Sequence, residues 1–332
     1  MLKIGVFDPA LGDNNGGISS NLGDLIISKY VDKYLVEIFP GDDIIKVSSH
    51  EFPSSKNLNS LKECKYVFVG GTNILSSDIN SYNQWKINKR KFNWLMSVPI
   101  TDIVLFGVGW WQYQSTPKYS TKKFYKKTLS RKVIHSLRDG YTQKMLKNIE
   151  IENVINTSCP TTWNLNGLDV NRIGMVDNCL FTLTDYMKDL ENDNIFLSVL
   201  SEQYSNKIFF FPQGLGDVKY LASLPFFKRN QRKITILNQS ISEFEKCLSS
   251  EDVDYIGTRL HAGINALQFK KNALILAVDN RATEMAKDIF LPVVKRNEFD
   301  RIKKWIAGDK IFNNIQIPCK KIELWKSQFK ES

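Results

Sequence analysis

A chain of 332 residues with 42% hydrophobic and 24% charged residues has the composition of a globular, soluble protein, and it is long enough for two domains of ordinary size. No apolar run approaches the roughly 20 residues that a membrane-spanning helix needs. The net charge of +10 is not accompanied by a recognised nucleic-acid-binding motif, so we expect no nucleic-acid partner.

Short apolar runs alternate with helical stretches from the first residues onward. In the first half of the chain we predict buried strands over residues 3–8, 43–49, 66–71, 102–110, 132–139 and 153–159. A glycine-rich loop follows the first of them and leads into a helix over residues 22–36. This alternation predicts parallel sheets with helices on both faces.

The composition loosens over residues 163–178, where asparagine and glycine are frequent, and we place a domain boundary there. A second series of strands is predicted over 179–184, 207–212, 233–237, 253–258, 273–278 and 292–295. Helices are predicted over 189–204, 217–224, 240–248, 261–269 and 281–290, with a basic helix over 298–307. The sequence therefore predicts an α/β protein with two Rossmann-like, doubly wound domains in tandem, residues 1–170 and 171–332. Such a pair is expected to bind ligands in the cleft between the domains, beyond the carboxyl ends of the strands.

The cysteines and the N-terminus bear on the cellular compartment. Five scattered cysteines form no CxxC pair and have no histidine at ligand spacing, so we expect reduced core thiols and no structural metal. Asp8 follows the first apolar residues too soon for a signal peptide. A cytoplasmic protein is the expectation.

The strongest local signal is Gly257-Thr258-Arg259-Leu260-His261, where a β-branched strand ends and a helix begins almost at once. Free backbone N–H groups and the positive end of the helix dipole favour an anion at such a turn. Arg259 can clamp a carboxylate or a phosphate with two N–H groups, and His261 can carry a proton near neutral pH. The alternative interpretation is a capping arginine beside a buried, hydrogen-bonded histidine.

Two weaker signals lie in the first half of the chain. Asn21-Leu22-Gly23-Asp24 opens the first long helix, and Asp24 either complements the helix dipole or accepts a proton from a sugar hydroxyl. Gly70-Gly71 ends a strand shortly before Asn73 and permits close approach of the backbone to a ligand.

Two more weak signals also fall at strand ends. Arg138, in Ser136-Leu137-Arg138-Asp139, either joins an anion site or pairs with its neighbouring aspartate. Gln213, in Pro212-Gln213-Gly214, ends a strand of the second domain. Each signal is weak alone, and their shared position at strand ends is what indicates one site.

A basic stretch between residues 117 and 133 contains no acid and is flanked or interrupted by aromatic residues, among them Trp110, Trp111, Tyr113, Phe124 and Tyr125. Its cations are Lys118, Lys122, Lys123, Lys126, Lys127, Arg131 and Lys132. One interpretation is a surface that contacts anionic lipid on the inner face of the cell membrane. The other is a solvated helix face with ordinary core aromatics.

Taken in order, Asn21-Leu22-Gly23-Asp24, Gly70-Gly71, Ser136-Leu137-Arg138-Asp139, Pro212-Gln213 and Arg259-Leu260-His261 resemble the motifs of the polysaccharide pyruvyltransferase family. The resemblance covers most of the chain, and its specific element is Arg-Leu-His. The family is similar to GT-B glycosyltransferases, so the resemblance implies two Rossmann-like domains and no metal. It also implies transfer of a pyruvyl unit from phosphoenolpyruvate to a sugar of a cell-surface polysaccharide precursor, as a cyclic ketal.

The resemblance implies roles for particular residues. Arg259, Leu260 and Arg138 would bind the donor together with Gln213, and His261 would be the acid that protonates it. Asp24, whose carboxylate accepts a proton in one of the two interpretations above, is the second catalytic candidate. The acceptor side of the cleft would be lined by Asn21, Gly23, Gly70, Gly71 and Asn73. Phosphoenolpyruvate would be a substrate with no separate cofactor, and the acceptor a lipid-linked sugar.

One position departs from the family pattern, which commonly has a tyrosine and a lysine after the strand that follows Arg-Leu-His. This chain has Asp279-Asn280-Arg281 there, and we expect Arg281 to supply the positive charge for the donor. A sugar-nucleotide donor would also need cations for its diphosphate. A GT-B glycosyltransferase with an activated sugar as donor is therefore the alternative enzyme, and a sugar- or anion-binding module is the non-enzymatic one.

Overall fold

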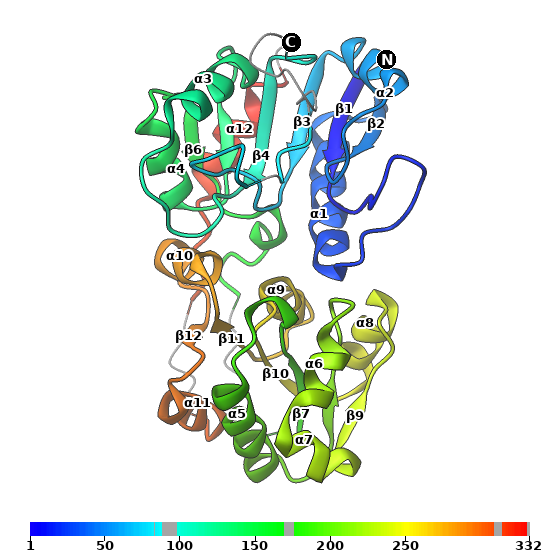
Figure 1. Ribbon diagram of the computed structural model, residues 1–332, viewed down its shortest axis with the longest axis vertical. Coiled ribbons are helices and arrows are strands. Elements are labelled where there is room, and N and C mark those ends of the chain that lie inside the picture. The colour runs from blue at the N-terminus through cyan, green and yellow to red at the C-terminus, as the bar shows by residue number, and fades with distance from the viewer. Residues whose placement is uncertain (83, 88–97, 169–175, 309–313, 331–332) are drawn as a thin grey trace. The chain divides into compact units, whose positions relative to one another are not determined.

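The chain folds into two compact units. The computed structural model describes residues 1–82, 84–87, 98–168, 176–308 and 314–330, so the boundary drawn between residues 170 and 171 lies outside the described residues. The first unit comprises Met1–Ser19, Asp24–Trp163 and Ile317–Ser332, and the second comprises Ser20–Gly23 and Asn164–Gln316. Figure 1 shows a sheet flanked by helices in each unit.

The first unit is built on a six-stranded parallel sheet in the order β2-β1-β3-β4-β5-β6. Its strands are β1 (Lys3–Asp8), β2 (Asp43–Ser48), β3 (Tyr66–Gly70), β4 (Ile103–Val108), β5 (His135–Leu137) and β6 (Val154–Asn156). All six residues of β4 are buried, as expected for a strand covered on both faces. The strand order reverses between β1 and β3, which is the kind of position where doubly wound sheets bind ligands.

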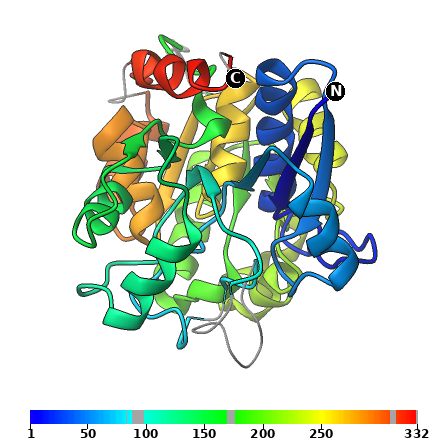
Figure 2. The same cartoon turned by 90° about the horizontal axis from the view of Figure 1, so that it is seen from above.

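Helices cover both faces of this sheet. They are α1 (Leu22–Ile38), α2 (Ser55–Lys62), α3 (Tyr119–Thr128), α4 (Gly140–Lys147), α12 (Cys319–Ser327) and the short 3₁₀ helix η1 (Pro160–Thr162). Trp163 contacts both Tyr34 of α1 and Trp325 of α12, at ring-centroid distances of 4.6 and 6.0 Å. Lys326 of α12 bonds Glu37 of α1 at 2.8 Å, and Figure 2 shows these two helices close together.

The C-terminal helix is assigned differently by the sequence and by the structure. The sequence-based boundary places it in a second domain of residues 171–332. The structure groups Ile317–Ser332 with the first unit instead. Trp325 lies 4.5 Å from Phe106 of β4, and Phe329 lies 5.4 Å from Phe68 of β3, both measured between ring centroids. Burial of these rings against the first sheet explains why the end of the chain returns to it.

The second unit repeats the design with the strand order β12-β11-β10-β7-β8-β9, again all parallel. Its strands are β7 (Asn178–Thr182), β8 (Ile208–Phe210), β9 (Ile234–Ile236), β10 (Val253–Gly257), β11 (Ala273–Ala277) and β12 (Val293–Lys295). The order reverses between β7 and β10, and the loops at their carboxyl ends hold the residues described below.

The helices of the second unit divide between the two faces of its sheet. In chain order they are η2 (Asp185–Met187), α5 (Leu190–Gln203), α6 (Asp217–Ser223), α7 (Pro225–Asn230), η3 (Gln231–Lys233), α8 (Ile241–Ser250), α9 (Leu260–Gln268), α10 (Asn280–Ile289) and α11 (Phe299–Ile306). Helices α5, α6, α7 and α11 share one hydrophobic core with the sheet. On α8, Phe244 stacks on Phe211 with ring centroids 4.2 Å apart.

The two-sheet, doubly wound architecture predicted from the sequence is confirmed, and each predicted strand is present. The ends differ by a few residues, most at β5, which is His135–Leu137 rather than 132–139. All five cysteines are free, as expected, although Cys319 is exposed at the start of α12 rather than part of the core. Among the described residues, no helix is long and apolar enough to cross a membrane.

Candidate functional site

Four loops at the carboxyl edge of the second sheet bring together residues that are distant in sequence. The loop after β7 carries Asp185 and Tyr186, and the loop after β8 carries Gln213 and leads to Asp217. Arg259 follows β10 after Thr258, and the turn after β11 carries Asp279 and Arg281. Parallel strands place these ends at the same edge, which is why the sequence signals converge.

Arg259 is buried, with only 4% of its surface exposed, and its guanidinium is held in place by two aspartates. Its Nε donates to Asp217 Oδ2 at 3.1 Å, and its Nη2 donates to Asp217 Oδ1 and, at 3.1 Å, to Asp185 Oδ1. The guanidinium also lies 5.1 Å from the centroid of the Tyr186 ring. Among the described residues, Nη1 has no bonding partner. Arg259 is thus pre-oriented with one of its nitrogens still available to a ligand.

Arg281 lies against the same tyrosine. Its Nε and Nη2 donate to Asp279 Oδ2 at 2.9 and 2.5 Å, Nη2 also donates to the Tyr186 hydroxyl, and its guanidinium is 5.7 Å from the ring centroid. Tyr186 is 48% exposed, so an aromatic ring with two guanidinium groups within 6 Å faces solvent. Such a group of side chains can bind an anion that also offers a flat or apolar surface.

His261 lies on the first turn of α9, two residues after Arg259, and is buried. On the same helix, position 263 requires glycine, because the Cβ of a larger residue would lie 2.5 Å from Ile275 of β11. The small residues of this turn therefore allow α9 to pack closely on the sheet. His261 and Arg259 thus belong to the same strand-to-helix turn.

Gln213 contacts Asn21 and Leu22 at the start of α1. The segment Ser20–Gly23 is grouped with the second unit, as is Gln213. Its Nε2 donates to Asn21 Oδ1 at 3.0 Å, and its backbone carbonyl accepts the Leu22 N–H at 3.0 Å. A Cβ on Gly23 would lie 2.7 Å from Gln213 Nε2, which explains the glycine. The Oε1 atom of Gln213 is buried and has no donor in the described part of the chain. A ligand hydroxyl or N–H would satisfy it.

The carboxyl edge of the first sheet holds the remaining predicted residues. Arg138 is buried, donates from Nε to Asp139 Oδ2 at 2.9 Å, and donates from Nη2 to Asn73 Oδ1 at 3.2 Å. The pairing of Arg138 with its neighbouring aspartate, one of the two interpretations of the sequence, is therefore present. Asp139 also caps α4 through the Thr142 N–H at 2.7 Å, so the pair is part of the framework as well as a cation at the sheet edge.

Gly70 and Gly71 make room for α1. A Cβ on Gly70 would lie 2.9 Å from Val31, and one on Gly71 would lie 2.3 Å from Ile27. Helix packing accounts for both glycines without a ligand. Gly71 and Thr72 have φ angles of 72° and 69°, so two successive residues are left-handed at this strand end. A non-glycine residue in that region is costly and is often found at functional positions.

Asp24 is buried on the first turn of α1, where it accepts a hydrogen bond from the Ser19 hydroxyl at 2.8 Å. His50 Nε2 lies 3.6 Å from Asp24 Oδ2. His50, Tyr186, Asp185 and Asp217 were not among the residues predicted from the sequence. His50 directly follows the predicted strand over 43–49, and Asp185 and Tyr186 follow the predicted strand over 179–184, so their position at strand ends was the signal that could have identified them.

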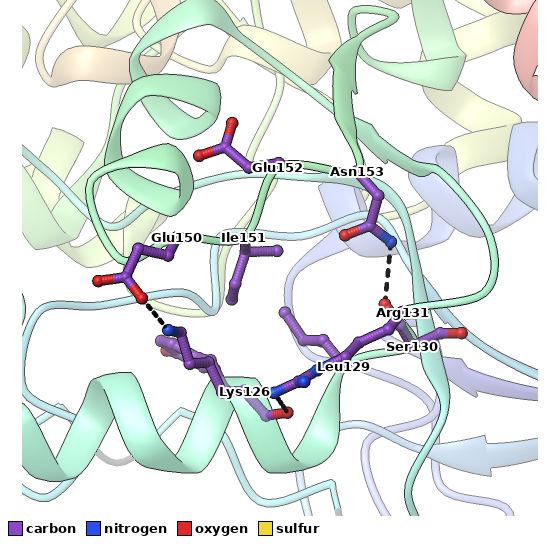
Figure 3. A pocket seen from close by; sticks show the side chains of 9 residues that line it. Lys126, Leu129, Ser130, Arg131, Glu150, Ile151, Glu152 and Asn153 are labelled. Atoms are coloured by element: carbon purple, nitrogen blue, oxygen red, sulfur yellow. Dashed lines mark hydrogen bonds and ion pairs between the residues drawn. The ribbon is translucent and has the colours of Figure 1, made fainter.

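A hollow of about 310 Å³ in the first unit lies elsewhere, beside α3 and the segments that precede β5 and β6 (Figure 3). Lys126 pairs with Glu150 in it, and Asn153 Nδ2 donates to the Ser130 carbonyl at 3.0 Å. These segments enter the strands, so the hollow is at the amino edge of the sheet. It contains none of the predicted site residues.

The basic stretch forms α3 and the residues around it, and the fold brings acids to it. Glu150 pairs with Lys122 and Lys126, Asp78 with Lys118, and Asp102 with Lys132. Of its cations, Lys123, Lys127 and Arg131 are exposed. Phe124 and Tyr125 are core residues, whereas Tyr113 and Tyr119 are exposed.

The model of the family "Polysaccharide pyruvyl transferase" matches residues 21–280, which is more than half of the chain. No curated protein matches. The solved structure of UDP-GlcNAc 2-epimerase from Neisseria meningitidis bound to UDP-GlcNAc is similar with a TM-score of 0.47 and 11% identity, over 99% of this chain and 100% of that one. The family match contains each predicted site residue except Arg281, which lies one position beyond it.

Proposed function

Because the chain belongs to the polysaccharide pyruvyl transferase family and is thus a transferase, we propose that its donor is phosphoenolpyruvate and its product a pyruvate ketal on a sugar of a cell-surface polysaccharide precursor. The observation that supports this donor is the pair of guanidinium groups, Arg259 and Arg281, within 6 Å of the Tyr186 ring. Phosphoenolpyruvate carries a carboxylate and a phosphate on a small planar core, and two fixed cations beside an aromatic ring suit it.

In this proposal the carboxylates around the arginines hold them in place before the donor arrives. Asp217 and Asp279 engage Nε and Nη2 of the two guanidinium groups, so each Nη1 is left for the donor. Fixed donors of this kind need no rearrangement when negative charge develops on the departing phosphate. Arg281 thereby takes the place of the lysine that the family commonly has.

His261 is the proposed acid. It would protonate the methylene carbon of the donor and generate an oxocarbenium-like centre at C2. A sugar hydroxyl attacks C2, phosphate leaves, and a second hydroxyl closes the ketal. The first-turn position of His261 beside Arg259 supports this role, since a donor held by the arginine would lie near the imidazole.

The donor is tested by incubating the purified protein with phosphoenolpyruvate and, separately, with a panel of sugar nucleotides. Thermal stabilisation by phosphoenolpyruvate and release of inorganic phosphate in the presence of methyl hexosides are the expected results. Stabilisation by nucleotides alone would favour the GT-B glycosyltransferase instead. His261→Gln is expected to lower turnover by about 100-fold or more. Full turnover in that variant would contradict the acid role, and a protein that binds anions without turnover would be a binding module.

For the acceptor we propose a lipid-linked sugar, reached by peripheral contact with an anionic membrane surface on the cytoplasmic side. The exposed residues of α3 and its surroundings support this contact: Lys123, Lys127 and Arg131 are exposed cations, and Tyr113 and Tyr119 are exposed aromatics. Basic and aromatic side chains together favour the lipid–water interface. The acids paired with the other lysines reduce the charge available for it.

A further inference from the structure

The segment over residues 185–189, which carries Tyr186, alternates between the interior of the second unit and the solvent. Asp185, Met187 and Asp189 are partly buried, whereas Tyr186 and Lys188 are exposed. The backbone of each partly buried residue is hydrogen-bonded to a side chain from another element of the same unit. The position of the exposed Tyr186 ring is therefore determined by the bonds that its neighbours make.

Two of these bonds are made by residues that the proposed function does not yet use. Arg296, which directly follows β12, donates from Nη1 to the Met187 carbonyl at 2.7 Å. The hydroxyl of Tyr220, on α6, accepts the Asp189 N–H at 2.8 Å. Arg296 is 8% exposed and Tyr220 is 2% exposed, so both side chains are fixed in the interior.

Asp193, on α5, connects these two side chains. It is fully buried, its Oδ1 lies 3.0 Å from Arg296 Nε, and its Oδ2 accepts the Tyr220 hydroxyl at 2.5 Å. Burial raises the pKa of Asp193 to about 6 while Arg296 acts in the opposite direction, so the carboxylate is ionised above this pH. Arg296, Asp193 and Tyr220 thus form one buried group, called the Arg296 cluster below.

We propose that the Arg296 cluster positions Tyr186 for binding of the donor, with Arg296 and Tyr220 acting through the 185–189 segment and not on the donor itself. This inference rests on the proposed function, in which the Tyr186 ring lies within 6 Å of the Arg259 and Arg281 guanidinium groups. A shift of the segment would break bonds to buried polar groups, which is costly, so the cluster keeps the ring beside both arginines. Arg296 and Tyr220 are therefore positioning residues.

A pair of tyrosine variants separates positioning from stability. Tyr220→Phe keeps the ring and removes the hydroxyl that bonds Asp193 and Asp189. Tyr204→Phe is the matched control, because Tyr204 is 3% exposed and its hydroxyl donates to the buried Asp254 at 3.1 Å, at the opposite end of α5. Both variants lose a buried hydrogen bond from a tyrosine to an aspartate, so we expect similar decreases in the urea midpoint.

The position of Tyr186 can be measured without ligand or turnover. Fluorine NMR of the protein labelled with fluorotyrosine observes its 12 tyrosines, and Tyr186→Phe assigns the resonance of interest. We expect this resonance to shift or broaden in Tyr220→Phe and in Arg296→Lys, since a lysine lacks the planar fork that reaches Asp193 and Met187 together. It should stay unchanged in Tyr204→Phe. An unchanged Tyr186 resonance in Tyr220→Phe, or an equal change in Tyr204→Phe, would overturn the proposal.

Turnover tests the consequence for the donor, with phosphate release from phosphoenolpyruvate and methyl hexosides as acceptors. Tyr220→Phe is expected to raise KM for phosphoenolpyruvate by about tenfold, because the ring no longer supports the two guanidinium groups, and to change kcat little. Tyr204→Phe should leave KM unchanged. In a Tyr186→Leu background, Tyr220→Phe should have no further effect on KM, because the ring that it positions is absent.

The outcomes distinguish this proposal from the proposed function. An active wild type whose KM is the same in Tyr220→Phe, or in which the effects of Tyr220→Phe and Tyr186→Leu on KM multiply, contradicts the positioning role alone. A wild type that releases no phosphate contradicts the proposed function, and the Tyr186 resonance then still decides whether the Arg296 cluster holds the ring.

Discussion

Asp217 holds the guanidinium of Arg259 through both of its carboxylate oxygens, with Oδ2 3.1 Å from Nε and Oδ1 against Nη2. The same fully buried carboxylate accepts the backbone N–H groups of Gln213, Gly214 and Asp185 at 3.0, 2.8 and 3.1 Å. One side chain therefore fixes the loops after β7 and β8 and the arginine after β10. Under the proposed function, loss of this carboxylate would affect both donor binding and local stability.

Asp217→Asn is expected to destabilise the protein and to weaken donor binding together. The change leaves the buried Arg259 cation without its main partner, and breaking such a pair costs about 3–5 kcal/mol of unfolding free energy. We expect a lower urea midpoint and a KM for phosphoenolpyruvate raised by at least about tenfold. Asp185→Asn is the control, because Asp185 contacts the same guanidinium but is one-third exposed, and its loss should cost under about 1 kcal/mol. Equal costs for the two variants would contradict the central position of Asp217.

Gly214→Ala is expected to displace Arg259 without removing any charge. A Cβ at this position would lie 2.4 Å from Arg259 Nη2, and Arg259 is already fixed by Asp217. We expect a KM for phosphoenolpyruvate about tenfold higher, which corresponds to ~1.4 kcal/mol of lost binding. Gly41→Ala is the control: its φ of 81° makes a side chain costly, but nothing lies within 4 Å of the added carbon. The control should lower stability and leave KM unchanged, and a similar KM in both variants would show that Arg259 does not bind the donor.

The fold could be predicted from the sequence because each buried strand is a short apolar run bounded by turn residues. The run Ala273–Ala277, for example, can be identified as a buried strand from its own residues alone. The place of Arg259 was predictable for the same reason, since it follows such a run directly. Its pairing with Asp185 and Asp217 was not, because these residues are 74 and 42 positions away and a local pattern does not show which side chains meet.

Other features depend on contacts that no local pattern encodes. Trp325 and Phe329 have the spacing of any amphipathic helix, and only the aromatic rings of β3 and β4 decide where they pack. The motif Gly70-Gly71 indicates close approach, but the group that approaches is Ile27 and Val31 of α1. A glycine in a sequence shows that space is needed and does not identify what fills it.

Lys123→Glu with Lys127→Glu is expected to weaken sedimentation with vesicles that contain phosphatidylglycerol. Both side chains are exposed on α3, and a lysine near an anionic surface contributes about 1 kcal/mol. Reversal of both charges should therefore reduce binding by more than about tenfold. Lys303→Glu with Lys304→Glu is the matched control, with the same charge change on the exposed side of α11. An equal loss in the control would assign the binding to net charge rather than to α3.

His135 is expected to make the stability of the protein fall on acidification. It is fully buried in β5, where Nδ1 accepts the Leu105 N–H at 3.1 Å and Nε2 donates to the Ser130 carbonyl at 2.9 Å. Burial lowers its pKa to about 4. Between pH 6.5 and 4 the unfolded chain therefore binds a proton that the folded chain does not, so the unfolding free energy decreases as the pH falls.

At pH 5 this linkage amounts to about 2 kcal/mol relative to pH 7, because the ordinary histidine pKa is about 6.5 and each pH unit below it contributes about 1.4 kcal/mol. Urea unfolding of the wild type and of His135→Asn across pH 5 to 7 measures the difference directly. The variant lacks the titrating group, so its unfolding free energy should depend less steeply on pH, whatever its stability at pH 7. Parallel pH dependences in the two proteins would mean that His135 takes up a proton in the folded state. In that case the Leu105 N–H would lose its acceptor, and the hydrogen bond between β4 and β5 at this position would be absent below pH 6.5.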